Sequence, residues 1–141
     1  METKITEIIA RGIMIKKNKI LLCCLKKGGH YFLPGGHVEF GEKAEGTLIR
    51  EFLEETNEKI QVGKFLGAFE NKYGDNSVHH EVNLVFHIDL TADNITSIED
   101  HIDYVYVTKD EFTEINFLPK FFKDVILNYW DNPQTFWTSD M

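Results

Sequence analysis

The sequence predicts an α/β protein whose first half is mostly β-structure, and three observations indicate this fold class. Short apolar runs rich in β-branched residues alternate with polar or glycine-containing turns in the first half of the chain. Two longer segments, 43–56 and 118–130, have the composition or the apolar spacing of helices. The 141 residues are 43% hydrophobic, and no repeat or proline-rich linker divides them. We therefore expect one domain spanning residues 1–141.

The β-elements are predicted from apolar runs bounded by turn residues. Residues 5–15 and 20–25 are expected to form a hairpin around the polar turn 16–19. Residues 31–33 form a short strand stopped by the Pro-Gly-Gly sequence at 34–36. Further strands are expected at 60–70, 81–90 and 103–107, with a polar surface loop at 71–80. Cys23 and Cys24 are adjacent in a strand, where alternation points them to opposite faces, so a disulfide between them is not expected.

Charge and hydropathy restrict the partners. The formal net charge is −8 and the pI is about 5.2, which argues against binding a nucleic acid polymer through a basic face. An acidic protein can still bind a small phosphate ester when a divalent cation lies between its carboxylates and the phosphates. No run approaches a membrane span, and the first residues lack the features of a signal peptide. We expect a cytoplasmic protein with no membrane partner.

The segment 43–56 carries an acidic face. Glu51, Glu54 and Glu55 stand at i, i+3 and i+4, where like charges repel by roughly 0.2–0.5 kcal/mol per pair. Apolar residues, including Leu48 and Phe52, cover another side of the same helix. Glutamate-rich helices are often only solvated faces, but a hard divalent cation with oxygen ligands would neutralise this cluster.

The spacing around this helix resembles a known family pattern. Gly36 is followed by Glu42 and then by Arg50-Glu51 and the pair Glu54-Glu55. This run resembles the Nudix box, G-x5-E-x7-R-E-U-x-E-E-x-G-U with U aliphatic, from residue 36 to residue 58. The resemblance implies a Nudix-type α/β/α sandwich with a central mixed β-sheet and the box loop-helix.

The chain departs from the box pattern near its end. Asn57 replaces the expected glycine, and asparagine is the second-best residue for the left-handed conformation that ends a helix. Glu58 replaces the last aliphatic residue, and Phe52 replaces a smaller one. These changes affect packing at the helix exit and leave the glutamates in place.

The resemblance implies a metal site. Glu51, Glu54 and Glu55 would be metal ligands or water activators, and the carbonyl of Gly35 would complete the shell around Mg²⁺, with Mn²⁺ as an alternative. Gly35 and Gly36 would let the backbone approach the metal and phosphate.

Arg50 is the expected structural partner of these carboxylates. It would orient Glu51 through contacts with Glu39 or Glu42. An ordinary i, i+4 pair between Arg50 and Glu54 is the alternative.

The implied reaction is hydrolysis of the pyrophosphate linkage in a nucleoside diphosphate joined to another group, as in a nucleoside triphosphate, a dinucleoside polyphosphate or a nucleotide sugar. Bound metal would activate water while a carboxylate removes its proton. Glu54 is one candidate for this carboxylate. Glu81 is the candidate outside the box, with Glu70 second, and Glu81 could turn towards the metal only from an ended or irregular strand.

Two tyrosines are candidates for stacking on the base of the nucleotide. Tyr73 lies in the expected polar loop, whereas Tyr31 can equally be a core residue. A zinc site formed by His79, His80 and Glu81 is disfavoured, because adjacent strand residues point apart and no third nitrogen or sulfur ligand is placed by spacing.

Two other functions compete with hydrolysis. A Nudix-fold sensor would hold a nucleotide without cutting it, but such proteins usually lose box glutamates, which this chain keeps. An isoprenoid diphosphate isomerase of the same fold would need a suitably placed catalytic cysteine.

The proline hallmarks of NADH and ADP-ribose hydrolases are absent, since no proline lies between Pro34 and Pro119. The nucleotide substrate stays open, and a homodimer is compatible with the sequence.

Overall fold

The computed structural model describes residues 3–141. Its elements in chain order are β1 (Ile5–Ile13), β2 (Ile15–Lys16), β3 (Lys19–Leu25), β4 (Tyr31–Phe32), β5 (Gly35–His37), α1 (Ala44–Thr56), β6 (Gln61–Tyr73), the 3-10 turn η1 (Asp75–Ser77), β7 (His79–Asp89), β8 (Ile102–Thr108), α2 (Lys109–Glu114), α3 (Phe122–Asp131) and β9 (Phe136–Asp140).

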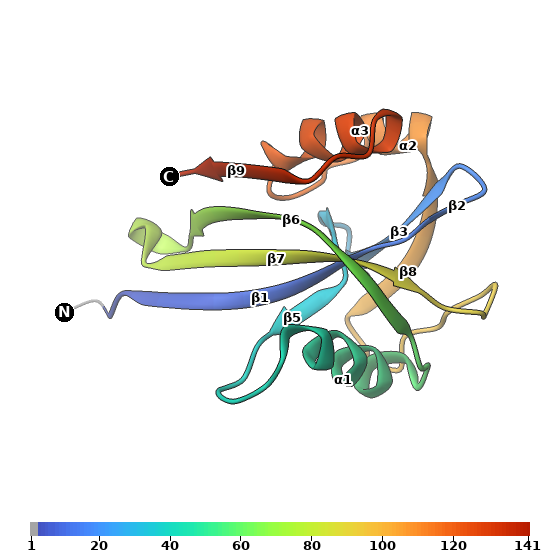
Figure 1. The fold of residues 1–141 in the computed structure, drawn as a ribbon, viewed down its shortest axis with the longest axis horizontal. Coiled ribbons are helices and arrows are strands. Elements are labelled where there is room, and N and C mark those ends of the chain that lie inside the picture. Colours follow the sequence, from blue (N-terminus) through green and yellow to red (C-terminus); the bar gives the residue numbers. More distant parts are fainter. Residues whose placement is uncertain (1–2) are drawn as a thin grey trace.

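The central sheet is mixed and has the strand order β5-β1-β7-β6-β9. Strand β1 runs parallel to β7 and antiparallel to β5, while β6 runs antiparallel to β7 and parallel to β9. In a second sheet, β3 pairs with β2, β4 and β8. Helix α1 lies on one side of the central sheet, and α2 and α3 lie on the other (Figure 1). The expected α/β/α arrangement around a mixed sheet is therefore present.

Each face of the central sheet buries its own apolar cluster. Leu48 and Phe52 of α1 pack in a cluster with Phe86 of β7. Val85, the neighbouring residue of β7, belongs instead to the cluster that contains Phe122 of α3. Because successive strand residues point to opposite faces, one strand supplies both cores. The sheet thus separates the side that carries α1 from the side that carries α3.

Helix α1 follows the sequence prediction closely. It begins after Lys43 and ends at Thr56, and the expected segment was 43–56. Asn57 has φ 60° and ψ 22°, and its N–H donates to the carbonyl of Leu53 at 3.0 Å. The left-handed termination predicted for Asn57 is confirmed, because this conformation satisfies a carbonyl of the last helical turn.

The predicted hairpin of residues 5–15 and 20–25 is wrong in its long arm. Only β2 and β3 form a hairpin, around Lys17 and Asn18, which both have positive φ. The longer strand β1 lies in the other sheet, where nine of its residues pair in parallel with β7. Met14 separates β1 from β2, so the chain changes sheets between them. A parallel partner about 70 residues away leaves no local signal in the sequence, whereas the nearest apolar run favours a hairpin.

The expected loop 71–80 is also wrong in its extent. Strand β6 continues to Tyr73 and β7 begins at His79, which leaves only 74–78 between them. Buried Asn71 and Asn83 explain the difference, since the amide of Asn83 donates to Oδ1 of Asn71 at 3.1 Å. Polar residues that suggest a loop can remain in a sheet when their side chains bond to each other.

The C-terminal part has more elements than the sequence predicted. Helix α3 begins at Phe122, not near residue 118, because residues 118–121 form turns around Pro119. Helix α2 was not predicted, although Thr108 and Glu111 form the reciprocal hydrogen bonds of a capping box. Strand β9 was also missed.

In the described part of the chain, none of the helices has the length and apolar character needed to cross a membrane.

Cys23 is buried and Cys24 is partly buried, and both thiols are free. The expectation that these neighbours form no disulfide with each other is confirmed.

Candidate active site

The two glycines that precede the box helix are packed tightly against the protein itself. A Cβ atom on Gly36 would lie 2.4 Å from Cδ of Glu51, and one on Gly35 would lie 2.0 Å from the carbonyl oxygen of Ala10. The expected reason for these glycines was close approach of the backbone to a metal and phosphate. The structure gives a more immediate reason, because a side chain at either position would collide with β1 or with a box carboxylate.

Arg50 organises the acidic side chains of the box. Its Nε and Nη2 atoms donate to the two carboxylate oxygens of Glu42 at 2.8 and 3.1 Å. Its Nη1 atom donates to Glu51 at 3.1 Å and to Glu54 at 3.4 Å. Glu39 lies farther away, at 3.8 Å from Nη2. Both sequence interpretations of Arg50 therefore hold at once, because one guanidinium has enough donors for all these contacts.

This network has an electrostatic consequence for Glu42. Hydrogen bonds from Arg50, and then from Thr47, lower the pKa of Glu42 to about 2. Glu42 is thus a fixed anion that anchors the arginine. Since Arg50 also donates to the carbonyl of His37 at 3.2 Å, it ties the helix to the end of β5.

Glu55 has a different environment from the other box glutamates. It is half-buried, and burial is the main cause that raises its pKa to about 7, with a further increase from neighbouring Glu51. The hydroxyl of Tyr104 donates a hydrogen bond to Oε2 of Glu55, which opposes this increase. Near neutral pH and without a neighbouring cation, Glu55 is therefore partly protonated.

This pKa predicts how the stability of the metal-free protein depends on pH. A carboxyl whose pKa is higher in the folded than in the unfolded state stabilises the fold at low pH, and this contribution is lost as the pH rises through about 7. In a chelating buffer, the wild-type melting temperature should fall between pH 6 and pH 8 by a few degrees more than that of Glu55→Gln, since the group is partly solvated. Parallel melting curves for the two proteins across this range would contradict the assignment.

The donor set is compatible with a hydrated divalent cation. Across residues 3–141, no group of three or more His, Cys, Asp or Glu side chains is arranged so that it could hold a metal ion by itself, as a cage of protein ligands would. Magnesium does not require such a cage, because it commonly binds one or two carboxylates and fills its shell with water and substrate phosphate. Half-buried Glu55 lies beside Glu51, and a cation bound between these two carboxylates would relieve their mutual repulsion.

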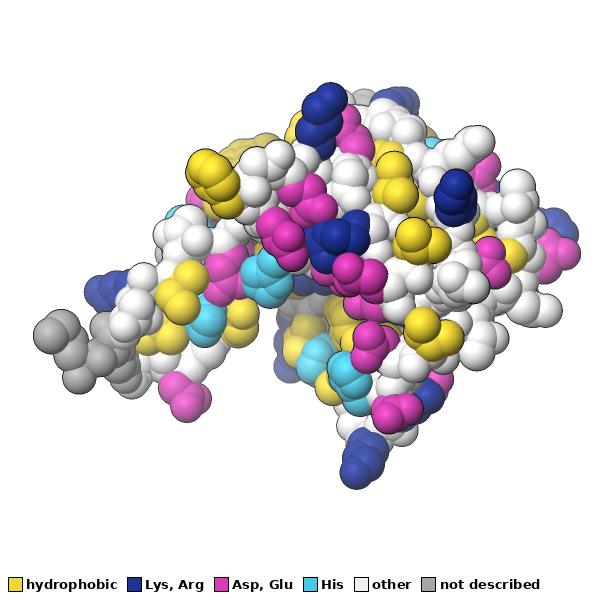
Figure 2. Space-filling model, turned by 90° about the horizontal axis from the view of Figure 1, so that it is seen from below, with side chains coloured by type: hydrophobic (Ala, Val, Ile, Leu, Met, Phe, Trp, Pro, Cys, Tyr) yellow, Lys and Arg dark blue, Asp and Glu magenta, His cyan; other side chains and the backbone are white. Residues whose placement is uncertain are grey.

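A cavity of about 710 Å³ provides room for a substrate. It is lined by residues of β1, β3, β4, β6 and β7 and of the segments before β4 and α3: Arg11, Leu25, His30, Phe32, Asn71, Lys72, Tyr73, Glu81, Leu118, Pro119 and Lys120. Seen from the α1 side, acidic side chains gather around a basic one beside a hollow in the surface (Figure 2). The volume is within the usual range for small-molecule sites.

Arg11 connects this cavity to the box. Its Nε donates to Oδ1 of Asn83 at 3.2 Å and its Nη1 donates to the carbonyl of Leu33 at 2.9 Å. Burial lowers the pKa of Arg11, while the negative charges of Glu81 and Glu51 act in the opposite direction. The guanidinium therefore lies within electrostatic reach of a cavity carboxylate and of a box carboxylate.

The two tyrosines proposed for base stacking differ in position, because only Tyr73 lines the cavity. Tyr73 lines the cavity, is 41% exposed, and stacks on His79 with ring centroids 4.6 Å apart. The carboxylate of Glu7 forms hydrogen bonds with the rings of His79 and His37. Tyr31 is not among the lining residues and packs against the α3-side core, while its neighbour Phe32 lines the cavity.

Glu81 is placed in the cavity, but not as the sequence suggested. It is the third residue of β7, and its pairing with Glu7 and Asn71 is regular. The expected strand start at this position is wrong, and the ended or irregular strand that Glu81 was expected to need is not found there. Glu81 instead reaches the cavity from a regular strand, on the same side of the sheet as Asn83. Glu70 lies on the opposite face, where it bonds to His80 at 3.2 Å. Whether Glu81 acts as the base stays a prediction.

The histidines behave as alternation predicts. His79 bonds to Glu7 and His80 bonds to Glu70, so these neighbours point to opposite faces of the sheet.

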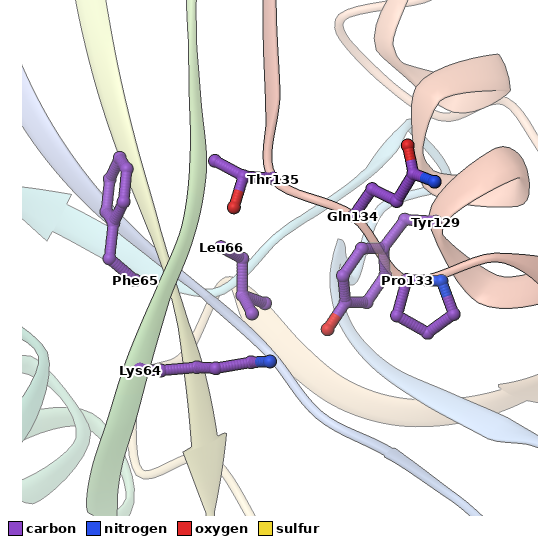
Figure 3. A pocket seen from close by; sticks show the side chains of 7 residues that line it. All are labelled: Lys64, Phe65, Leu66, Tyr129, Pro133, Gln134 and Thr135. Carbon is purple, nitrogen blue, oxygen red and sulfur yellow. The ribbon is translucent and has the colours of Figure 1, made fainter.

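A second, smaller cavity carries no comparable chemistry. It measures about 210 Å³ and lies between β6 and the segment that joins α3 to β9 (Figure 3). Its lining residues are Lys64, Phe65, Leu66, Tyr129, Pro133, Gln134 and Thr135, and none of them is an acid.

Sequence reasoning missed two residues of the site. Arg11 is the one charged residue in the apolar centre of β1, and such an isolated charge could have indicated a functional position. Tyr104 alternates with apolar residues in β8 and gives no comparable signal. Its partnership with Glu55 depends on a contact 49 residues away in the sequence.

The fold and the arginine-bound glutamates together define a Nudix-type protein, and comparison with known proteins agrees. The profile of the NUDIX domain matches residues 7–127, and the chain belongs to this family. The ADP-ribose pyrophosphatase of Methanocaldococcus jannaschii is 34% identical over 129 residues, which cover 86% of this chain and 72% of that protein. The chain is accordingly a pyrophosphohydrolase.

Solved structures show the same fold at lower sequence identity. A NUDIX hydrolase from Nitrosomonas europaea has a TM-score of 0.72 and 19% identity, covering 99% of this chain and 80% of its own. The MutT protein from Methanosarcina mazei Go1 has a TM-score of 0.74 and 21% identity, covering 93% of this chain and 96% of its own.

Proposed function

We propose that this enzyme hydrolyses, with Mg²⁺, the pyrophosphate linkage of a nucleoside diphosphate joined to another group. The observation that carries the proposal is the arrangement of the box, where Arg50 holds Glu51 and Glu54 beside half-buried Glu55. Glu51, Glu54, Glu55 and the carbonyl of Gly35 are the proposed ligands. The cavity lined by Arg11, Tyr73 and Glu81 supplies space for the rest of the substrate.

The protein groups have distinct proposed roles. Bound magnesium would lower the pKa of water and neutralise charge on the phosphates. Glu54, whose side chain is 58% exposed, can accept a proton from solvent-accessible water while Arg50 limits its orientation. Arg50 acts by holding the carboxylates in place and is tied down by Glu42.

The cavity favours a substrate with a nucleoside at one end. Tyr73, supported from behind by His79, presents an aromatic face on which a base can stack. ADP-ribose is the first substrate to test, because the relative from Methanocaldococcus jannaschii is named for it. The missing proline hallmark does not remove this candidate, since a binding site is defined by its cavity and not by one sequence marker.

The function is tested by a nucleotide panel with product identification. ADP-ribose, nucleotide sugars, dinucleoside polyphosphates and nucleoside triphosphates are incubated with the enzyme and either Mg²⁺, Mn²⁺ or a chelator. We expect metal-dependent cleavage between the two phosphates, which releases a nucleoside monophosphate from ADP-ribose. Tight nucleotide binding without cleavage would support the sensor function instead.

Glu81 is the proposed base outside the box, and its role makes a specific prediction. Glu81→Gln should reduce kcat by about 10²- to 10⁴-fold with little change in KM, because the substitution keeps the shape and removes the proton acceptor. Glu70→Gln is the matched control, since Glu70 lies in the adjacent strand on the opposite face of the sheet. If both variants turn over like the wild type, the base belongs to the box.

A further inference from the structure

Tyr104 lies in β8, in the second sheet, and its side chain contacts the acidic face of the box helix α1. It pairs with Cys23 of β3 and is only 8% exposed. Its ring packs against Phe52 of α1, with centroids 5.7 Å apart, and its hydroxyl donates to Oε2 of Glu55. Tyr104 thus contacts α1 twice: its ring packs on the apolar side of the helix, and its hydroxyl bonds to the acidic side.

The box carboxylates are held by two different groups. Arg50 contacts Glu42, Glu51 and Glu54, at distances from 2.8 to 3.4 Å. Glu55 is on the side of the helix that faces β8 and takes its hydrogen bond from Tyr104. A neutral hydroxyl is suited to this position because it orients a carboxylate without neutralising the charge that a cation needs.

We infer that Tyr104 is a positioning residue that fixes the carboxylate of Glu55 for binding a divalent cation. This inference rests on the proposed function, because Glu55 must be a ligand for its orientation to matter. The hydroxyl donates to Oε2 of a carboxylate that also lies beside Glu51, and the packing of the ring on Phe52 restricts movement of the hydroxyl. Residues that orient metal ligands in this way commonly change metal affinity when they are replaced.

A purely structural role makes a different prediction. If Tyr104 served only to fill the core, Tyr104→Phe would keep the ring, its contact with Phe52 and the metal affinity. Removal of the hydroxyl alone separates packing from positioning, since the aromatic volume hardly changes.

The test is direct calorimetric binding of Mn²⁺ to the full-length wild type, Tyr104→Phe, Glu55→Gln and the double variant, with metal-free melting curves to confirm folding. Tyr104→Phe should weaken Mn²⁺ binding by about 10- to 100-fold. In the Glu55→Gln background the same substitution should have little further effect, because the ligand through which it acts is already lost. Tyr106→Phe, which removes a hydroxyl two residues along β8, should bind like the wild type.

Each contrary result has a separate meaning. Wild-type affinity in Tyr104→Phe, or an equal loss in both backgrounds, would overturn the positioning role and leave the proposed function intact. Absence of Mn²⁺ binding by the wild type, with and without ADP-ribose, would overturn both.

Discussion

Replacement of Glu54 or Glu55 by glutamine is expected to reduce turnover by at least about 10²-fold while the protein stays folded. Glutamine keeps the length and shape of the side chain but removes the negative charge that would bind a cation or accept a proton. Steady-state rates on an authenticated substrate, combined with metal-free melting curves, measure the two effects separately.

The matched control for this pair is Glu45→Gln. Glu45 lies on the same helix, in its exposed first turn, and is the acidic residue there. The substitution removes the same charge from the same helix, so it should leave kcat within about twofold of the wild type, as expected of a surface position. Equal losses for Glu45 and the box glutamates would mean that net charge, and not the site, controls the rate.

Gly36→Ala is expected to have a comparably large effect without removing any functional group. The new methyl group would lie 2.4 Å from Cδ of Glu51, so the carboxylate, held by Arg50, must move or the loop must shift. Displacement of a catalytic group by about 1 Å can cost about 10²-fold in rate. Initial rates at saturating substrate and increasing Mg²⁺ would show this as a loss that added metal restores only partly.

Gly46→Ala provides the control for a glycine substitution in the same segment. Gly46 is the third residue of α1 and has open space around it, since the nearest atom to an added Cβ is 4.0 Å away. Alanine favours a helix interior by about 1 kcal/mol relative to glycine, so this variant should be active and slightly more stable. Full activity in Gly36→Ala would show that the close contact with Glu51 is unimportant.

The box helix was predictable because its information is local. The spacing of Arg50 and the glutamates, the apolar side of the helix and the terminating Asn57 all lie within one short segment. Helical periodicity and capping depend on neighbours three or four residues away, so they can be derived from the sequence alone.

The sheet arrangement was not predictable to the same degree. The pairing of β1 with β7 joins residues such as Ile9 and Asn83, which are 74 positions apart in the chain. Buried Asn71 and Asn83 look like loop residues until their mutual hydrogen bond is known. Long-range pairing and polar groups satisfied across strands leave no periodic pattern, and this is why β6 and β7 were predicted too short.

The same limit applies to the site outside the box. Sequence reasoning selected Glu81 and Tyr73, and both line the cavity, but it gave Glu81 the wrong place in its strand. It did not find Arg11 or Tyr104, because their partners come from other strands and from α1. Local motifs identify the chemistry of this protein, while the surrounding residues that orient it emerge only from the fold.

Calorimetric titration of Mg²⁺ into the wild type and a Glu51/Glu54/Glu55→Gln triple variant, each with and without ADP-ribose, tests the central claim most directly. We predict Mg²⁺ binding by the wild type, strengthened by nucleotide because substrate phosphates complete the metal shell, and no detectable binding by the triple variant. Identical titrations for the two proteins, or no binding by the wild type in either condition, would contradict the claim that these glutamates form a magnesium site.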